Sequence, residues 1–151
     1  MKIISRYGNI LDTDAKYICH CVNAQGVMGS GVAKAIRDKY PKAFNVYRKE
    51  YESRGRLSMG YVIGADCDKH IILNLVGQKY YGNEPGKCYL DYIALRKGIS
   101  SINKYISEPV AFPMIGCGLA GGDWKVVSEI LEEESTNFQP LVYVLDDRIP
   151  F

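Results

Sequence analysis

The chain has 151 residues, of which 47% are hydrophobic and 24% are charged, and these fractions are typical of a globular protein rather than of a disordered or collagen-like chain. Its nineteen basic and seventeen acidic residues give a net charge of +2, which is too small to predict wrapping along a nucleic-acid backbone. This length fits one domain with one core, so we expect residues 1–151 to form a single domain.

The sequence gives no sign of a membrane segment or a metal site. Its longest apolar runs, such as 71–76, are only strand-sized, and the amino terminus lacks the layout of a signal peptide. Cys19 and Cys21 have no second close pair to complete a zinc site, and the five cysteines are odd in number. We therefore expect a cytoplasmic monomer with reduced thiols, no metal and no cofactor.

Strand-like and helical patterns alternate along the chain. The predicted strands are 2–6, 17–22, 60–63, 70–76, 109–113 and 141–145, and the predicted helices are 31–39, 41–53, 90–105 and 123–133. Pro41 suits a first helical position and Asp123 suits a helix cap. The uninterrupted apolar run at 71–76 is typical of a central strand with both faces covered. The alternation predicts an α/β fold, and such sheets bind ligands beyond the carboxyl ends of their strands.

A first glycine loop follows the predicted strand 17–22. Residues 23–33 read NAQGVMGSGVA, which is a glycine-spaced turn that opens a helix. Glycine lets the backbone approach an anion, and the free amides at a helix N-terminus carry about half a positive charge. The loop matches neither a Walker loop nor the full dinucleotide fingerprint. A phosphate cradle and a plain tight turn both remain open for this loop alone.

A second glycine loop follows the predicted strand 109–113. Residues 113–124 read PMIGCGLAGGDW and again connect a strand to a helix. Four glycines within seven positions are more than a single turn requires. Two such loops can bind two phosphates, so the pair predicts an anionic ligand more strongly than either loop does alone.

Three separated motifs make the chain similar to the macro domains, in particular to the branch with ADP-ribose 1''-phosphate phosphatase and the terminal ADP-ribose protein glycohydrolases. The motifs are GNIL at 8–11, HCVN at 20–23 leading into MGSGVA at 28–33, and PMIGCGL at 113–119 ending at Trp124. They stand in the expected order across nearly the whole chain. The resemblance implies a three-layer α/β/α macro-domain fold, with helices on both faces of a central mixed sheet of about six strands, and ADP-ribose as ligand.

The resemblance also implies a role for each matching residue. Asn9 and Ile10 would lie at the adenine, with Asn9 where many relatives carry aspartate, and Asn23 would meet the distal ribose hydroxyls. Tyr143 is a candidate to pack on adenine, although a core tyrosine explains it equally well. The other candidate contacts lie beside these residues and along the two glycine loops: Gly8, Cys21, Val22, Met28, Gly29, Ser30, Gly31, Val32, Ala33, Ile115, Gly116, Cys117, Gly118, Leu119, Ala120 and Gly121.

Three residues are candidates for catalysis. His20 is a candidate general acid or base, with a core histidine as the alternative. In the glycohydrolase branch a lysine after the central strand attacks the anomeric carbon, and Lys79 is similarly placed. That branch pairs its lysine with an aspartate where this chain has Ala120, and the nearest carboxylate is Asp123.

Three functions share this one pocket. They are a phosphatase acting on ADP-ribose 1''-phosphate, a hydrolase releasing ADP-ribose from a protein or nucleic acid, and a reader that binds ADP-ribose without reaction. The GNIL motif at 8–11 and the histidine at position 20 favour a hydrolase acting at the distal ribose, phosphatase-like first.

Overall fold

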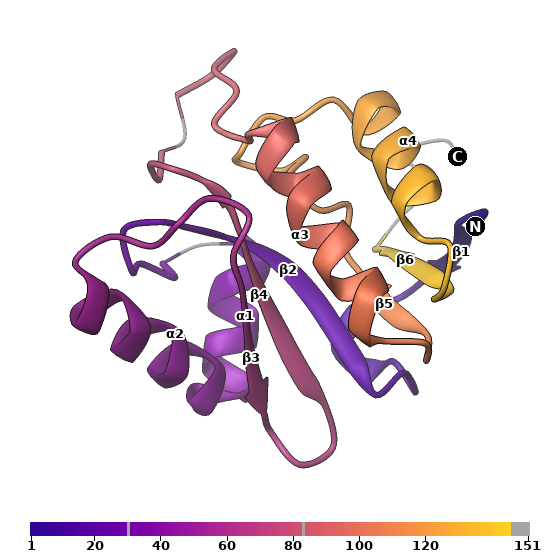
Figure 1. The fold of residues 1–151 in the computed structure, drawn as a ribbon, viewed down its shortest axis with the longest axis horizontal. Coiled ribbons are helices and arrows are strands. Elements are labelled where there is room, and N and C mark those ends of the chain that lie inside the picture. Colours follow the sequence, from indigo (N-terminus) through magenta and orange to yellow (C-terminus); the bar gives the residue numbers. More distant parts are fainter. Residues whose placement is uncertain (30, 83, 146–151) are drawn as a thin grey trace.

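The computed structural model describes residues 1–29, 31–82 and 84–145. A six-stranded sheet, in the order β1-β6-β5-β2-β4-β3, lies between two layers of helices (Figure 1). All neighbouring strands are parallel except β3, which is antiparallel to β4. The predicted α/β/α fold with a mixed sheet is therefore confirmed. The strands are β1 (Ile4–Tyr7), β2 (Tyr17–Asn23), β3 (Val62–Asp66), β4 (Ile71–Gln78), β5 (Val110–Phe112) and β6 (Pro140–Val144).

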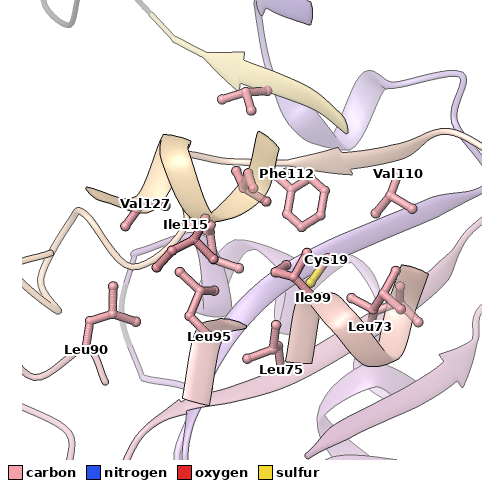
Figure 2. Close-up of a cluster of buried hydrophobic side chains, with 14 of the residues drawn as sticks. Cys19, Leu73, Leu75, Leu90, Leu95, Ile99, Val110, Phe112, Ile115 and Val127 are labelled. Atoms are coloured by element: carbon pink, nitrogen blue, oxygen red, sulfur yellow. The ribbon is translucent and has the colours of Figure 1, made fainter. Parts of the chain in front are cut away.

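Two helices cover each face of the sheet. On one face, Ile18 and Ile72 pack against helices α1 (Gly31–Lys39) and α2 (Pro41–Arg54). On the other, Cys19 and its neighbours pack against α3 (Tyr92–Tyr105) and α4 (Trp124–Glu134), as Figure 2 shows. Successive strand residues point to opposite faces, so up to Val22 the even-numbered side chains of β2 point toward α1 and α2 and the odd-numbered ones toward α3 and α4. A register shift between Val22 and Asn23 ends this alternation.

The cluster in Figure 2 holds α3 against the sheet. Leu75, Leu95 and Ile99 are fully buried in it, and each such side chain stabilises the fold by roughly 1.5–3 kcal/mol. Helix α3 lies so close to β4 that a Cβ at Gly98 would overlap the side chain of Leu75. This close approach seats α3 over β4, and it leaves the outer strand β3 less covered on that face.

Local hydrogen bonds explain where the elements differ from the predicted bounds. Helix α3 begins at Tyr92 rather than at position 90, because the Asp91 side chain accepts hydrogen bonds from the N–H groups of Ile93 and Ala94 and so caps the helix. Strand β3 runs from Val62 to Asp66, later than the predicted 60–63. Gly60 has a φ of +84° and its N–H donates to the Val76 carbonyl oxygen, so it belongs to the turn before the strand.

Two further local features complete the comparison. Asp123 caps α4 by accepting from the N–H of Lys125, and Pro41 begins α2, as predicted. The short 3-10 helix η1 (Ile10–Asp12) was not predicted; it begins where the Asn9 side chain accepts from the Leu11 N–H. Three residues are too few to show a helical repeat in the sequence.

Candidate functional site

Both glycine loops lie at the carboxyl edge of the sheet, where the five parallel strands end (Figure 1). The first loop follows β2 and the second follows β5, and these two strands are neighbours. From β2 the chain leaves toward α1 on one face, and from β5 it leaves toward α4 on the other. Neighbouring parallel strands whose chains diverge in this way form the switch point at which open α/β sheets bind ligands. The topology therefore places the two loops on opposite sides of one candidate site.

Asn23, the last residue of β2, organises the first glycine loop. Its side-chain oxygen accepts from the backbone N–H groups of Gln25 and Val27, at 3.0 and 3.3 Å, and its side-chain nitrogen donates to the Val27 carbonyl oxygen at 2.8 Å. The hydroxyl of Tyr47, from α2, lies 2.9 Å from the same side-chain oxygen. An amide nitrogen carries two hydrogens, and the second has no partner among the described residues; contact of Asn23 with a ligand stays a prediction.

Replacing Asn23 by alanine is expected to lower the free energy of unfolding by about 2–3 kcal/mol, because it leaves buried donors of the loop unpaired. Tyr47→Phe removes one donor and leaves the two N–H bonds to Asn23 in place, so it should cost about 1 kcal/mol. Urea unfolding of both variants measures the difference. Equal losses would show that Asn23 does not organise the loop.

The loop between β4 and α3 joins both glycine loops. The N–H of Tyr81 donates to the Gln25 side-chain oxygen at 3.0 Å. The N–H groups of Tyr89 and Leu90 donate to the Ala120 carbonyl oxygen at 2.6 and 3.2 Å. Sequence reasoning missed these contacts, because their partners are 56 and about 30 positions apart and no local pattern records them.

Glycines of the second loop fall into two kinds. Gly116 and Gly121 have φ values of +73° and +74°, and a Cβ would overlap Leu90 at the first and the Lys87 carbonyl at the second, so turn geometry and packing require them. Gly118 has no heavy atom within 4 Å of a Cβ position and no left-handed φ. Gly29 in the first loop is similar, since its nearest such atom is 3.8 Å away. Nothing within the described chain requires glycine at these two positions, which leaves open space for a ligand.

The remaining predicted contact residues differ in how much they expose. The side chains of Ile10, Val22, Met28, Ile115 and Ala120 are buried, so these residues can offer a ligand only their backbone. Cys21, Ala33, Cys117 and Tyr143 are half-buried, whereas Gly8, Asn9, Gly31, Val32 and Leu119 are exposed. Ser30 lies outside the described residues.

The proposed adenine contacts are engaged in local structure. The side chain of Asn9 accepts from the Leu11 N–H at 3.0 Å. The hydroxyl of Tyr143 lies 2.7 Å from Thr13 Oγ1, and its ring packs on the cluster that contains Ile10. Both residues border the carboxyl edge, and contact with adenine stays a prediction for each.

His20 lies inside the core, on the face covered by α1 and α2. Its Nε2 is 2.6 Å from the Asn74 side-chain oxygen, and its Nδ1 is buried without a partner among the described residues. Burial lowers the pKa of His20 to about 4, although the hydrogen bond to Asn74 acts in the opposite direction. This placement supports the core alternative over an acid or base that meets substrate.

Lys79 and Asp123 both lie exposed on loops at the carboxyl edge. Lys79 follows β4, and its Nζ is 5.4 Å from the centre of the Tyr80 ring. The Asp123 side chain accepts from the Lys125 N–H at 3.0 Å, while the Asp123 N–H donates to the Tyr92 hydroxyl at 3.0 Å. The loop that follows β4 and the loop that contains Asp123 are joined through the Ala120 carbonyl oxygen, and a place for Lys79 and Asp123 in one site stays a prediction.

Neither half-buried thiol at this edge is suited to nucleophilic attack. Burial raises the pKa of Cys21 and of Cys117 to about 12, which keeps both as neutral thiols near neutral pH, and the thiolate is the nucleophilic form. Within residues 1–29, 31–82 and 84–145, no group of three or more His, Cys, Asp or Glu side chains is placed to hold a metal ion. No helix in the same part of the chain has the length and apolar character to cross a membrane.

The sequence matches a family model described as "Macro domain" over residues 12–131. The DNA ADP-ribosyl glycohydrolase of Mycobacterium tuberculosis (strain ATCC 25618 / H37Rv) is 31% identical over 133 residues, a match that covers 82% of this chain and 36% of that protein. The chain therefore spans only about a third of the length of this relative. The ADP-ribose glycohydrolase OARD1 of Bos taurus is 27% identical over 134 residues, covering 85% of this chain and 81% of that protein.

The match to a phosphatase is shorter. An ADP-ribose 1''-phosphate phosphatase of Aspergillus fumigatus is 45% identical, but over only 40 residues, which are 26% of this chain and 20% of that protein. Among solved structures, a protein of unknown function from Bacteroides thetaiotaomicron is 28% identical with a TM-score of 0.84, covering 95% of this chain and 98% of that one. The macrodomain of Mycobacterium tuberculosis DarG is 25% identical with a TM-score of 0.78, covering 93% and 96%.

Proposed function

This chain belongs to the macro domain family, and on that basis we propose that it binds ADP-ribose between its two glycine loops and releases it from a macromolecule by hydrolysis at the distal ribose. The observation that carries the binding proposal is the open space at Gly29 and Gly118, on loops that lie on opposite sides of the β2/β5 switch point. Backbone N–H groups of such loops suit phosphates. An affinity in the low micromolar range corresponds to about −8 kcal/mol.

A glycohydrolase is favoured over the phosphatase that the motifs alone suggested first. The two relatives named as glycohydrolases match 82% and 85% of this chain, whereas the phosphatase match covers 26%. The placement of His20 also argues against an acid/base route through that residue, because its side chain is buried in the core.

In the proposed reaction the lone pair of Lys79 Nζ attacks C1'' of the distal ribose. The bond from C1'' to the macromolecule breaks. Asp123 accepts the proton that the attacking amine loses, and the departing atom takes up a proton from Asp123 or from water. The ribose ring opens to a Schiff base between Nζ of Lys79 and C1''. Water then hydrolyses this C=N bond, which restores Lys79 and frees ADP-ribose. Both side chains are exposed on loops joined through the Ala120 carbonyl oxygen, which supports their action on one substrate.

Apolar side chains around the site support a macromolecular substrate. Several of the large hydrophobic residues that the structure exposes lie at the carboxyl edge: Tyr7 at the end of β1, Val32 in the first turn of α1, and Val27, Tyr80, Tyr81 and Leu119 on loops. Free ADP-ribose 1''-phosphate would not need such a rim. Tyr80 and Tyr81 are 50% and 59% exposed beside Lys79, and exposed aromatic rings next to cations suit nucleobase stacking. A nucleic-acid substrate, as the name of the mycobacterial relative states for that protein, is therefore proposed ahead of a protein.

The deciding experiment compares three substrates: an ADP-ribosylated oligonucleotide, an ADP-ribosylated peptide and ADP-ribose 1''-phosphate. We expect free ADP-ribose to be released fastest from the oligonucleotide, and calorimetry to show ADP-ribose binding. Faster phosphate release from the third substrate would restore the phosphatase assignment. Absence of heat at millimolar ADP-ribose would remove the binding proposal.

One observation favours a reader as the second candidate. Ala120 stands where the similar glycohydrolase branch carries its aspartate, and Asp123 already serves as a helix cap. ADP-ribose binding without turnover of any of the three substrates would establish this alternative.

Gly118→Val is expected to weaken ADP-ribose binding at least about a hundredfold, which is about 2.7 kcal/mol, because the new side chain fills the space left for the ligand. The melting temperature should stay unchanged, since Gly118 has neither packing contacts nor a left-handed φ. Gly64→Val is the matched control: Gly64 also lacks a left-handed φ, its nearest atom is 3.8 Å away, and it lies in the middle of β3. Calorimetry that finds equal binding in both variants would move the site away from the second loop.

A further inference from the structure

Strand β3 has a free edge. Backbone bonds join Tyr61 to Val76 and Cys67 to His70, and the register of β3 and β4 continues the same pairing between these points. In an antiparallel ladder only alternate residues bond to the neighbouring strand, so the odd-numbered residues of β3 face β4. The N–H and C=O groups of Val62, Gly64 and Asp66 therefore point away from the sheet, and no backbone hydrogen bond among the described residues reaches them.

A groove of about 400 Å³ runs beside this edge, between β3 and α3. Its floor includes Gly64 and Leu73, and its α3 wall is formed by Lys97, Ser101 and Tyr105. The groove exists because α3 is seated over β4 rather than β3, and because Gly64 contributes no side chain to fill it. Tyr105 is 77% exposed although it borders an apolar surface, so its ring is accessible to another molecule.

The positions of the wall residues along β3 follow from their contacts. The side chain of Lys97 lies across Gly60, since a Cβ there would meet it at 2.7 Å. Helix α3 returns from β4 and so runs parallel to β3. Eight helical residues and four strand residues advance by a similar length, roughly 12–14 Å. Lys97 is thus level with the beginning of β3, whereas Tyr105 is level with Gly64 at its centre.

We propose that β3 pairs antiparallel with β3 of a second copy of this chain, about a two-fold axis at Gly64. In this register Gly64 faces the partner's Gly64, and Val62 faces the partner's Asp66. All three residues present outward N–H and C=O groups, so the two edges satisfy one another. The two six-stranded sheets become continuous, and the interface is isologous, as in the commonest class of homo-oligomer.

The charges along this edge of one copy are complementary to those along the same edge of a second copy. Asp66 and Lys97 are exposed, and neither has an ion pair within the part of the chain that the structure describes. Side chains at even-numbered positions of β3 point toward the α3 face, where Val62 packs. The antiparallel register therefore brings the partner's Asp66 to the α3 face opposite Val62, next to Lys97. The two-fold symmetry repeats this contact between Lys97 and the partner's Asp66, so that it occurs twice in the dimer. This repetition favours a second copy over an unrelated peptide as the occupant.

Tyr105 fills the centre of the proposed interface. The two copies of Tyr105 approach the axis from both sides, above the facing glycines, and each ring covers part of the other copy's groove. A side chain at position 64 would occupy the same space. This inference departs from the monomer expected from the sequence, because neither the free edge nor the groove leaves a local pattern there.

Sedimentation velocity across a dilution series tests the dimer, with Lys97→Glu, Asp66→Lys and the double variant that exchanges both charges. We expect a concentration-dependent dimer in the parent. Each single variant should raise the dimer dissociation constant at least about tenfold, because like charges then face each other, and the double variant should restore most of the loss. Lys34→Glu, on α1, is the matched control and should dimerise like the parent. Circular dichroism establishes that every variant is folded.

Tyr105→Ser provides an independent test, because the exposed ring makes little contact with its own chain and the variant should fold normally. It should also raise the dimer dissociation constant at least about tenfold. A parent that remains monomeric at the highest soluble concentration would overturn the proposal. So would dimers that are indifferent to both single charge reversals and to Tyr105→Ser.

Discussion

Lys79→Ala should reduce release of ADP-ribose from an ADP-ribosylated oligonucleotide at least about a thousandfold, since loss of a covalent nucleophile removes the whole route and leaves only binding and positioning. Affinity for ADP-ribose should change only a few-fold, because Lys79 lies on the loop after β4 rather than on either glycine loop. Initial rates at saturating substrate and calorimetry with ADP-ribose measure the two quantities separately. Lys79→Arg should not rescue turnover, because a guanidinium group stays protonated.

The lysine route leaves a trace that a merely structural lysine would not. Borohydride should trap an adduct of ADP-ribose on the parent, and mass spectrometry should locate it at position 79. Lys87→Ala is the matched control, since Lys87 lies on the same loop with its Nζ 5.0 Å from the centre of an aromatic ring, Tyr89. Lys79→Ala with full turnover would refute the nucleophile, and a trapped adduct at Lys87 would move it.

The fold was largely predictable because its signals are local. Helix α1 begins and ends where the pattern placed it, Pro41 begins α2, and Asp123 caps α4. The apolar run of β4 is buried between β2 and β3, as the lack of alternation indicated. The bounds of β3 were missed because its start depends on the left-handed turn at Gly60 and on a hydrogen bond to Val76, sixteen residues later.

The candidate site was predictable only in part. Its two glycine loops are visible as motifs, and the order of the strands places them together. The sequence could not show which glycines are required by the backbone conformation or packing of the chain, and which leave room for a ligand. Gly118 and Gly121 look alike in a motif, yet only Gly121 packs against the Lys87 carbonyl. The roles of Tyr47 and Gln25 were also hidden, because each depends on a partner from another element.

Burial within β2 decided the interpretation of His20. Asn23 lies three positions after His20 in the sequence, which suggested a place at the ligand for His20. His20, however, points into the core beneath α1 and α2, next to Asn74. The register of β2 shifts between Val22 and Asn23, so Asn23 leaves the regular alternation and its side chain turns into the first glycine loop. Sequence spacing alone does not show which residues of a strand are buried within it and which lie in the loop at its end.

The buried network around Asn74 also defines the protonation of His20. The Asn74 side-chain nitrogen donates to the carbonyl oxygens of Ala43 and Ile63, at 3.2 and 3.1 Å. Its side-chain oxygen therefore acts as the acceptor toward His20, and Nε2 carries the hydrogen of the neutral ring. A proton on Nδ1 would create a buried charge whose extra donor has no partner within the described chain, which explains why burial lowers the pKa of His20 to about 4.

We expect this histidine to destabilise the fold in acid. Above the ordinary pKa of about 6.5, His20 is neutral in both the folded and the unfolded state, and its full contribution to stability is present. As the pH falls from there to about 4, the unfolded chain binds a proton that the folded protein excludes. The free energy of unfolding should fall by about 3 kcal/mol over this window and by little more from this group below it.

Urea unfolding of the parent and of His20→Gln between about pH 7 and pH 4 isolates this contribution. Glutamine can still donate to the Asn74 oxygen but does not titrate, so the variant should lack about 3 kcal/mol of the parent's acid-induced loss. The carboxylates are common to both proteins and cancel in the difference. At neutral pH the variant should keep turnover of the oligonucleotide within a few-fold, whereas loss of a general acid or base would cost about a hundredfold or more. Parallel pH profiles of stability would show that the imidazole is not protected from protonation, and a large loss of turnover in a folded variant would return His20 to the reaction.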